Sequence, residues 1–164
     1  MTHSTTSGHI TGSHFLTFYC LVTMEITFYV VSDTSPEKRL HTACRIIEKA
    51  HQQKQAVYIH ARNQAEAEQL DELLWTFRPE SFIPHHLVGE GPTPPPPIRI
   101  GWQAIPHEAH EILINLHGDA PPRPTQFRRI IEIVGGDDAM REAARQHWRF
   151  YKQQGYAVTS HNVA

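Results

Sequence analysis

Strand-like runs alternate with helical patterns along most of this chain, and this alternation restricts its fold more than any other feature. Glu25–Val31 is rich in β-branched and aromatic residues, which is typical of a buried strand. The next five residues, Ser-Asp-Thr-Ser-Pro, are suited to capping a helix and to forming its first turn. The helix predicted after them has one face built at helical spacing from Leu40, Ala43, Cys44, Ile47 and His51.

The same alternation continues towards the end of the chain. A strand at 56–59 precedes a helix that Asn63 can cap and that runs to about Phe77. An irregular stretch follows, and then come three strand-like runs and a closing helix, at 98–102, 111–117, 129–134 and 139–154. This order predicts an α/β fold, a three-layer sandwich in which helices cover both faces of a parallel or mixed sheet.

The motifs expected of a nucleotide-binding enzyme are missing from the sequence. The first strand–helix turn has no glycine, and neither GxGxxG nor GxxxxGK[ST] occurs anywhere in the chain. Gly89 and Gly91 are followed by Pro92 rather than by a helical pattern. There is no evident nucleophile–base pair, and Asp137-Asp138 is explained as a helix N-terminus. We therefore expect no nucleotide site, no cofactor and no intrinsic catalytic activity.

Metal and direct DNA binding also receive little support from composition. The 13 histidines are scattered, and neither an HExxH motif nor a cysteine partner accompanies them, so we expect no metal site. Cys20 and Cys44 lack CxxC spacing, which suits the reducing cytoplasm. A net charge of −2 gives no general attraction to DNA, so any role with nucleic acid would be local or indirect.

The first part of the chain differs from the rest. Residues 1–14 are mostly Thr, Ser, Gly and His, which cannot support a core. The apolar run at 15–24 is too short to span a bilayer and lacks the basic residues of a signal peptide, so no membrane partner is expected. We expect residues 24–160 to form the domain. Residues 1–23 would be a disordered extension or the result of a wrongly assigned start, with an extra edge strand as the alternative.

A tryptophan lies on the polar side of the helix predicted at 64–77. Trp75 falls opposite the apolar face formed by Ala67, Leu70 and Leu74. An exposed indole requires a cover, either a nearby loop such as the Phe82 segment or a partner protein. Because Trp is enriched in binding hot spots, we favour a partner.

The closing helix combines a basic stripe with a second tryptophan. Arg141, Arg145, Arg149 and Lys152 follow one another on the side opposite an apolar arc, and Trp148 lies among them. A basic stripe alone is often only a solvated surface. With an indole beside it, guanidinium groups can bind carboxylates while the ring forms a wall for an apolar side chain. The stripe therefore predicts a site for an acidic peptide, and single-stranded nucleic acid stacked on Trp148 is the alternative ligand.

Three local motifs resemble the chi subunit family of DNA polymerase III. The segment Leu-Asp-Glu-Leu-Leu-Trp at 70–75 is followed by Pro-Glu-Ser-Phe-Ile-Pro-His at 79–85 and by Gly-Glu-Gly-Pro at 89–92. The resemblance extends from Met24 to about Tyr156. It implies a Rossmann-like fold and a non-catalytic accessory subunit of the clamp-loader complex of a DNA-directed DNA polymerase. Such a protein acts in the cytoplasm and is associated with the nucleoid through the replisome.

The resemblance also implies partners and their sites. Members of the family pair with the psi subunit, which docks on the clamp loader, and they bind the acidic C-terminal tail of single-stranded-DNA-binding protein. DNA is then contacted only indirectly. By similarity, Trp75 and Phe82 face psi, while the tail is received by Arg141, Arg145, Trp148 and Arg149. The sequence departs from the family in the run 94–97, which is proline here and usually richer in glycine, and at Trp148, where tyrosine is common.

Overall fold

The computed structural model describes residues 24–89, 91 and 93–164. The expectations for residues 1–23 lie outside this range. Within it, no helix is long and apolar enough to cross a membrane.

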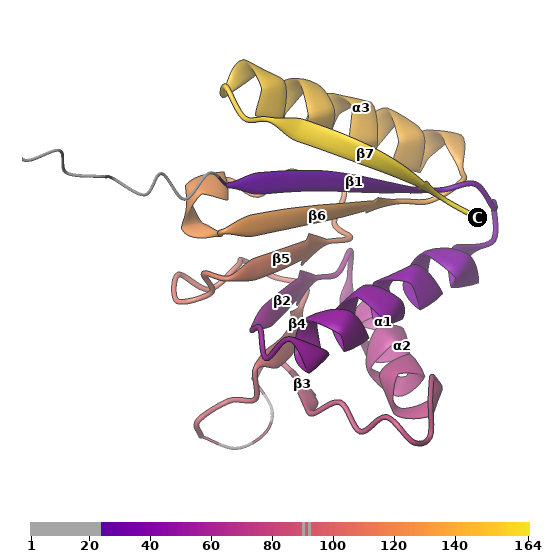
Figure 1. The fold of residues 1–164 in the computed structure, drawn as a ribbon, viewed down its shortest axis with the longest axis vertical. Coiled ribbons are helices and arrows are strands. Elements are labelled where there is room, and N and C mark those ends of the chain that lie inside the picture. Colours follow the sequence, from indigo (N-terminus) through magenta and orange to yellow (C-terminus); the bar gives the residue numbers. More distant parts are fainter. Residues whose placement is uncertain (1–23, 90, 92) are drawn as a thin grey trace, which may run out of the picture.

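A single parallel sheet organises the domain (Figure 1). Its seven strands lie in the order β3-β4-β2-β5-β6-β1-β7, and every neighbouring pair is parallel. The predicted α/β fold is therefore confirmed, and the sheet is parallel rather than mixed. The strands are β1 (Glu25–Val31), β2 (Val57–His60), β3 (His85–Leu87), β4 (Ile98–Gly101), β5 (Ile112–Asn115), β6 (Arg129–Val134) and β7 (Val158–Val163).

Three α-helices cover the two faces of this sheet. Helices α1 (Pro36–Gln52) and α2 (Gln64–Thr76) pack on one face, and α3 (Asp138–Gln153) lies alone on the other, over β6 and β7 (Figure 1). A short 3₁₀ helix, η1 (Pro124–Gln126), precedes β6. Each α-helix begins at a side chain that accepts a hydrogen bond from a backbone N–H of the first turn, and these capping residues are Ser35, Asn63 and Asp137.

The sheet separates two apolar clusters. Beneath α1 and α2, Leu40, Ile47 and Leu70 pack with buried residues of the central strands, as their helical spacing predicts. The cluster on the α3 side includes Phe28, Leu113 and Tyr151. Helix α3 contributes less to its core than its sequence suggests, because only His147 and Tyr151 are fully buried. The rest of the predicted apolar arc of α3 is only partly buried.

Both edge strands of the sheet went unpredicted. Strand β3 is three residues long and lies in the stretch expected to be irregular. Strand β7 is mostly exposed, contains Thr159, Ser160, His161 and Asn162, and continues past residue 160, where we expected the domain to end. Strand β7 buries little side-chain surface, so it needs no apolar pattern. Pairing of its backbone with β1 is sufficient to hold β7 in the sheet.

Candidate protein-binding surfaces

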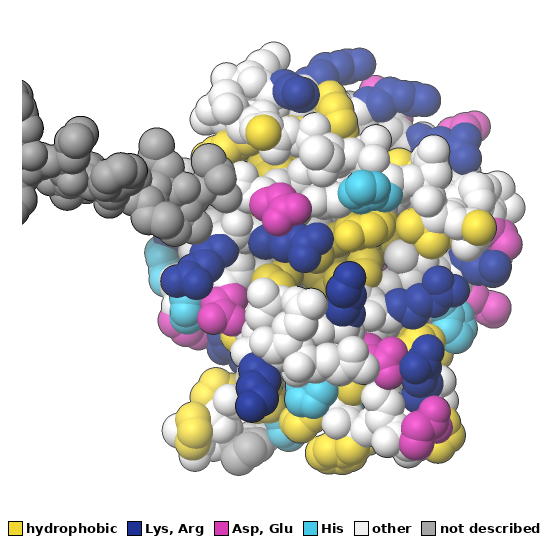
Figure 2. All heavy atoms as spheres, in the orientation of Figure 1, with side chains coloured by type: hydrophobic (Ala, Val, Ile, Leu, Met, Phe, Trp, Pro, Cys, Tyr) yellow, Lys and Arg dark blue, Asp and Glu magenta, His cyan; other side chains and the backbone are white. Residues whose placement is uncertain are grey.

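A groove runs between α3 and the β1–β7 edge of the sheet. It has a volume of about 480 Å³ and an apolar floor that includes Phe28, Val30 and Val134. Lys and Arg side chains gather along the outer side of α3, with hydrophobic atoms exposed between them (Figure 2). The remaining residues that line the groove are Arg141, Ala144, Arg145, Trp148, Arg149 and Ser160. The structure thus brings together all four residues that the sequence assigned to the peptide site.

Trp148 forms one wall of the groove, but its position differs from our expectation. It does not stand opposite the sheet within the basic stripe. Its ring is half-buried and packs edge-on against Phe28 of β1, with ring centroids 5.2 Å apart and an interplanar angle of 61°. The reason is that β1 and β7 extend beneath this side of α3, so a ring at the boundary of the helix meets the sheet. Lys152 covers the ring with its ammonium group 5.7 Å from the centroid.

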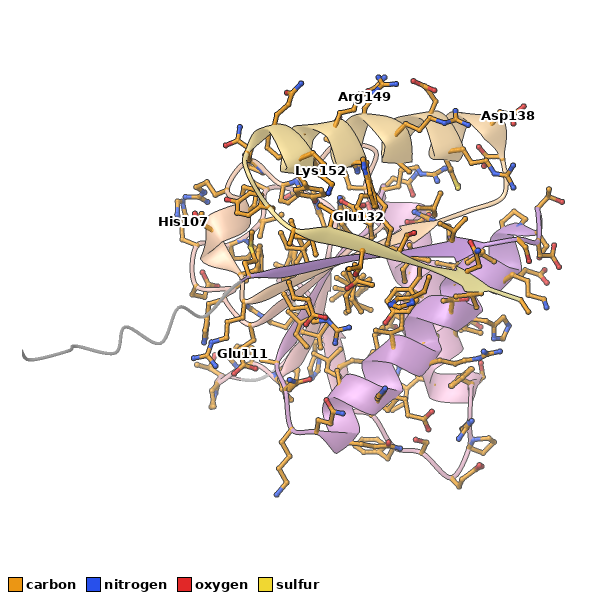
Figure 3. All side chains as sticks on the ribbon, turned by 45° about the horizontal axis from the view of Figure 1, so that its top comes forward. His107, Glu111, Glu132, Asp138, Arg149 and Lys152 are labelled. Atoms are coloured by element: carbon orange, nitrogen blue, oxygen red, sulfur yellow. The ribbon has the colours of Figure 1, made fainter. Side chains whose placement is uncertain are left out.

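The three arginines of the groove occupy different environments. Arg145 is exposed and forms an ion pair with Glu142, 3.0 Å away on the same helix. Arg149 points away from the body of the protein (Figure 3). Arg141 is partly buried, and its Nε is a buried donor without a hydrogen-bond partner in the described part of the chain. Because Arg141 also lines the groove, the other N–H groups of its guanidinium are the ones that can meet an incoming acceptor.

A second surface lies at the other end of the sheet, where α2 meets the loop before β3. Trp75 is 50% exposed and Phe82 is 70% exposed, and they rank with Val88 as the large hydrophobic residues most exposed in the described part of the chain. The predicted outward position of Trp75 on α2 is confirmed. The two rings are tilted against each other with centroids 5.7 Å apart. The Phe82 segment therefore touches Trp75, as expected if a nearby loop covers this side chain. It leaves half of the indole exposed, however.

A buried histidine supports this aromatic pair. The ring centroid of His85 lies 4.7 Å from that of Trp75, beneath it. Nδ1 of His85 lies 2.6 Å from the carbonyl oxygen of Ile83, and Nε2 lies 3.1 Å from a carboxylate oxygen of Asp71. These contacts join the loop to α2, so the Trp75–Phe82 patch is presented on a fixed base.

A buried arginine lies at the carboxyl edge of the sheet, where ligands bind in many parallel α/β proteins. The guanidinium group of Arg39 donates to the carbonyl oxygens of Ile133 and Leu116 and forms an ion pair with Glu66, 2.9 Å away. These contacts connect β5, β6 and the start of α2. Among the described residues, no group of three or more His, Cys, Asp or Glu side chains could hold a metal ion.

Sequence reasoning missed the sheet residues of the groove and one buried acid below it. Phe28, Val30 and Ser160 line the groove because β1 and β7 meet under α3, which only the fold reveals. Glu132 is 4% exposed and lies between apolar residues of β6, and a carboxylate within such a run was a detectable signal.

The fold defines a Rossmann-like α/β protein, and its two surface features are of the kinds through which proteins bind one another. Comparison with known sequences identifies the family. Residues 24–159 match the model of the DNA polymerase III chi subunit, HolC. The chain is 40% identical over 138 residues to DNA polymerase III subunit chi of Pseudomonas aeruginosa, covering 84% of this chain and 96% of the relative.

Two more distant relatives agree. DNA polymerase III subunit chi of Haemophilus influenzae is 31% identical over 137 residues, which is 83% of this chain and 95% of the relative. The Escherichia coli subunit chi is 30% identical over 139 residues, with 82% and 95% covered. This chain belongs to the DNA polymerase III chi subunit family. It is an accessory subunit of a DNA polymerase complex that acts in DNA replication.

Proposed function

We propose that this chain is a non-catalytic adaptor with two binding surfaces. The groove under α3 binds the acidic C-terminal tail of single-stranded-DNA-binding protein, and the Trp75–Phe82 patch binds the psi subunit. Through psi the chain joins the clamp loader, and it reaches DNA only through the protein that coats it. This places its action in the cytoplasm, at the nucleoid, as part of the replisome.

The observation that carries the peptide-binding function is the combination of an apolar floor with an arginine rim. An acidic tail that ends in apolar residues presents carboxylates and a hydrophobic side chain close together. The rim can bind the carboxylates through Arg141, Arg145 and Arg149, while Phe28 and Trp148 enclose the apolar side chain. Charge-assisted contacts of this kind contribute about 1.5–3 kcal/mol each.

The psi-binding function is supported by the chemistry of the other patch. An exposed Trp–Phe pair suits a hydrophobic partner, and aromatic side chains are frequent binding hot spots. The patch lies close to β3, whereas the groove lies beside β7, and these strands form opposite edges of the sheet. One molecule can therefore bind both partners at the same time.

Titration of a synthetic acidic tail peptide tests the function of the groove. We expect Arg145→Ala to weaken binding about tenfold or more, because a charge-assisted contact is lost. Arg45→Ala, which removes an exposed arginine from α1, is the matched control and should bind the peptide as the wild type does. Equal affinities of the wild type and Arg145→Ala would contradict the proposal.

A single-stranded oligonucleotide added without the binding protein separates the alternative ligand from the peptide. We expect no shift of the oligonucleotide in a native gel at the concentrations that saturate the peptide. A shift that Arg145→Ala abolishes would instead make nucleic acid the ligand of the groove. Co-purification of a small psi-like subunit with the wild type, and its absence with Trp75→Ala, tests the second surface.

A further inference from the structure

Two buried side chains hold α3 on the sheet, and both of them bear polar groups. His147 and Tyr151 are the buried residues of this helix, and Tyr151 also packs in the apolar cluster with Phe28. Both reach the carboxylate of Glu132, which lies on β6 beneath α3 (Figure 3). The position of α3, and with it the shape of the groove, therefore depends in part on this buried carboxylate.

Three side chains converge on Oε1 of Glu132. Tyr151 donates its hydroxyl over 2.7 Å, Asn115 of β5 donates its side-chain amide over 3.0 Å, and Nδ1 of His147 lies 3.2 Å away. The contact with His147 is not well aligned for a hydrogen bond, so its attraction is mainly electrostatic. A buried carboxylate is costly without a positive partner, and His147 is the side chain placed to supply that charge.

The geometry around His147 favours its protonated form. Its Nε2 lies 2.9 Å from the carbonyl oxygen of Gly118, which can only accept, so Nε2 carries a proton. A neutral ring would then turn the bare lone pair of Nδ1 towards the carboxylate of Glu132. Burial by itself lowers the pKa of His147, but Glu132, the carbonyl of Gly118 and the charge of Asp119 together raise this pKa above its ordinary value.

The ring also borders a second cavity, of about 360 Å³, at the carboxyl ends of β5 and β6. This cavity gives protons from solvent a path to His147. Val134 and Ala144 line both this cavity and the groove, so the two share a wall. Besides Glu132 and Tyr151, the charged or titratable groups around His147 and this cavity are Arg39 of α1, Arg62 before α2, His117 and Asp119 after β5, and Asp137 at the start of α3.

We propose that protonated His147, paired with Glu132, holds α3 in the position that keeps the groove open, so that the affinity for an acidic peptide falls when His147 loses its proton. This inference rests on the proposed function of the groove. His147 is a positioning residue, because it does not line the groove itself, whereas Trp148, the next residue, forms the wall. Deprotonation leaves Glu132 without its cation and weakens one of the two buried attachments of α3.

The direction of the effect follows from the folded-state pKa. A histidine whose pKa is raised by folding stabilises the structure fully below its ordinary value of about 6.5, and this stabilisation is lost as the pH rises through the raised value. Between pH 6 and 9 the peptide carboxylates stay ionised and the arginines stay protonated. No histidine is among the residues that line the groove. A change of affinity in this range therefore reports on a group outside the groove.

The test measures binding of an N-acetylated acidic tail peptide with a free C-terminal carboxylate, from pH 6 to 9 at constant ionic strength. We expect the wild type to lose about threefold or more of its affinity over this range. His147→Gln, which can still donate to Gly118 but carries no charge, should show no such loss. Glu132→Gln retains an acceptor for Tyr151 and Asn115 and should also bind independently of pH. NMR titration of the wild type should assign the raised pKa to His147.

Tyr151→Phe is the matched control. It removes the other buried attachment of the same helix to Glu132 but leaves the His147–Glu132 pair, so it should be less stable and still lose affinity as the pH rises. Circular dichroism at each pH shows whether every variant is folded. Binding by the wild type that does not change with pH would overturn the inference and leave the groove function intact. A pH dependence that persists in His147→Gln would overturn it as well, and no binding at any pH would overturn both proposals.

Discussion

The two candidate surfaces lie at opposite edges of one sheet and differ in shape and charge. Beside β3, Trp75 and Phe82 project from α2 and its loop as an uncharged aromatic pair. Beside β7, the groove is concave, and arginines form its rim. Binding to a projecting apolar patch is favoured mainly by the burial of its apolar surface. Binding to a basic groove is favoured mainly by contacts between arginines and carboxylates. The same fold thus offers two contacts that should respond to different perturbations.

The largest expected effect is that of removing Trp75. We expect Trp75→Ala to weaken psi binding by about 100-fold, because truncating a hot-spot aromatic costs about 2–4 kcal/mol. Binding of the tail peptide should not change, since the groove lies at the other edge. Calorimetric titration of both ligands measures this, with Glu72→Ala, an exposed neighbour on α2, as control. If a folded Trp75→Ala protein bound neither ligand, the two surfaces would not be independent binding sites.

The next effect distinguishes the arginines within the groove. Arg141→Ala should weaken peptide binding by more than Arg145→Ala does, about tenfold to 100-fold against the wild type. Arg141 is partly buried, so solvent screens its contact with a carboxylate less, whereas Arg145 is exposed and already has a partner in Glu142. Fluorescence anisotropy of a labelled peptide gives the comparison. The reverse order would show that the exposed arginine contributes more to binding than the partly buried one.

Binding at the two surfaces should also differ in its dependence on salt, with a smaller change of affinity. Raising the ionic strength from about 0.05 to 0.5 M should reduce peptide affinity several-fold, because the Debye length falls well below 10 Å and screens the arginine contacts. Psi binding, which buries Trp75 and Phe82, should be nearly unaffected. Parallel titrations at several salt concentrations measure both slopes. Equal slopes would mean that the patch near β3 also binds through charge.

The smallest expected effect is an increase in peptide affinity. Glu142 forms an ion pair with Arg145 at the rim and competes with the carboxylates of the peptide. Glu142→Gln should therefore increase peptide affinity about twofold, consistent with the low net energy of exposed ion pairs. Gln146→Ala changes an exposed neighbour without altering charge and serves as the control. Weaker binding by Glu142→Gln would indicate that Glu142 positions Arg145 rather than competes for it.

The comparison also shows where sequence patterns suffice. On α2, Ala67, Leu70 and Leu74 are buried and Trp75 is exposed, as helical spacing predicts. One side of this helix faces the sheet and the other faces solvent. The angular position of a residue around the helix axis therefore decides whether its side chain is buried. On α3 the same rule misplaced Trp148, because the edge strand β7 widens the surface beneath the helix, and β7 itself has no apolar pattern.

The sequence by itself determined the alternation of strands and helices, the caps at Ser35, Asn63 and Asp137, and the family, because these depend on local hydrogen bonding and on order along the chain. Only the tertiary structure decided that Phe28 and Trp148 share a groove and that His147 meets Glu132 beneath α3. These contacts join distant parts of the chain through strand order, which no local pattern specifies.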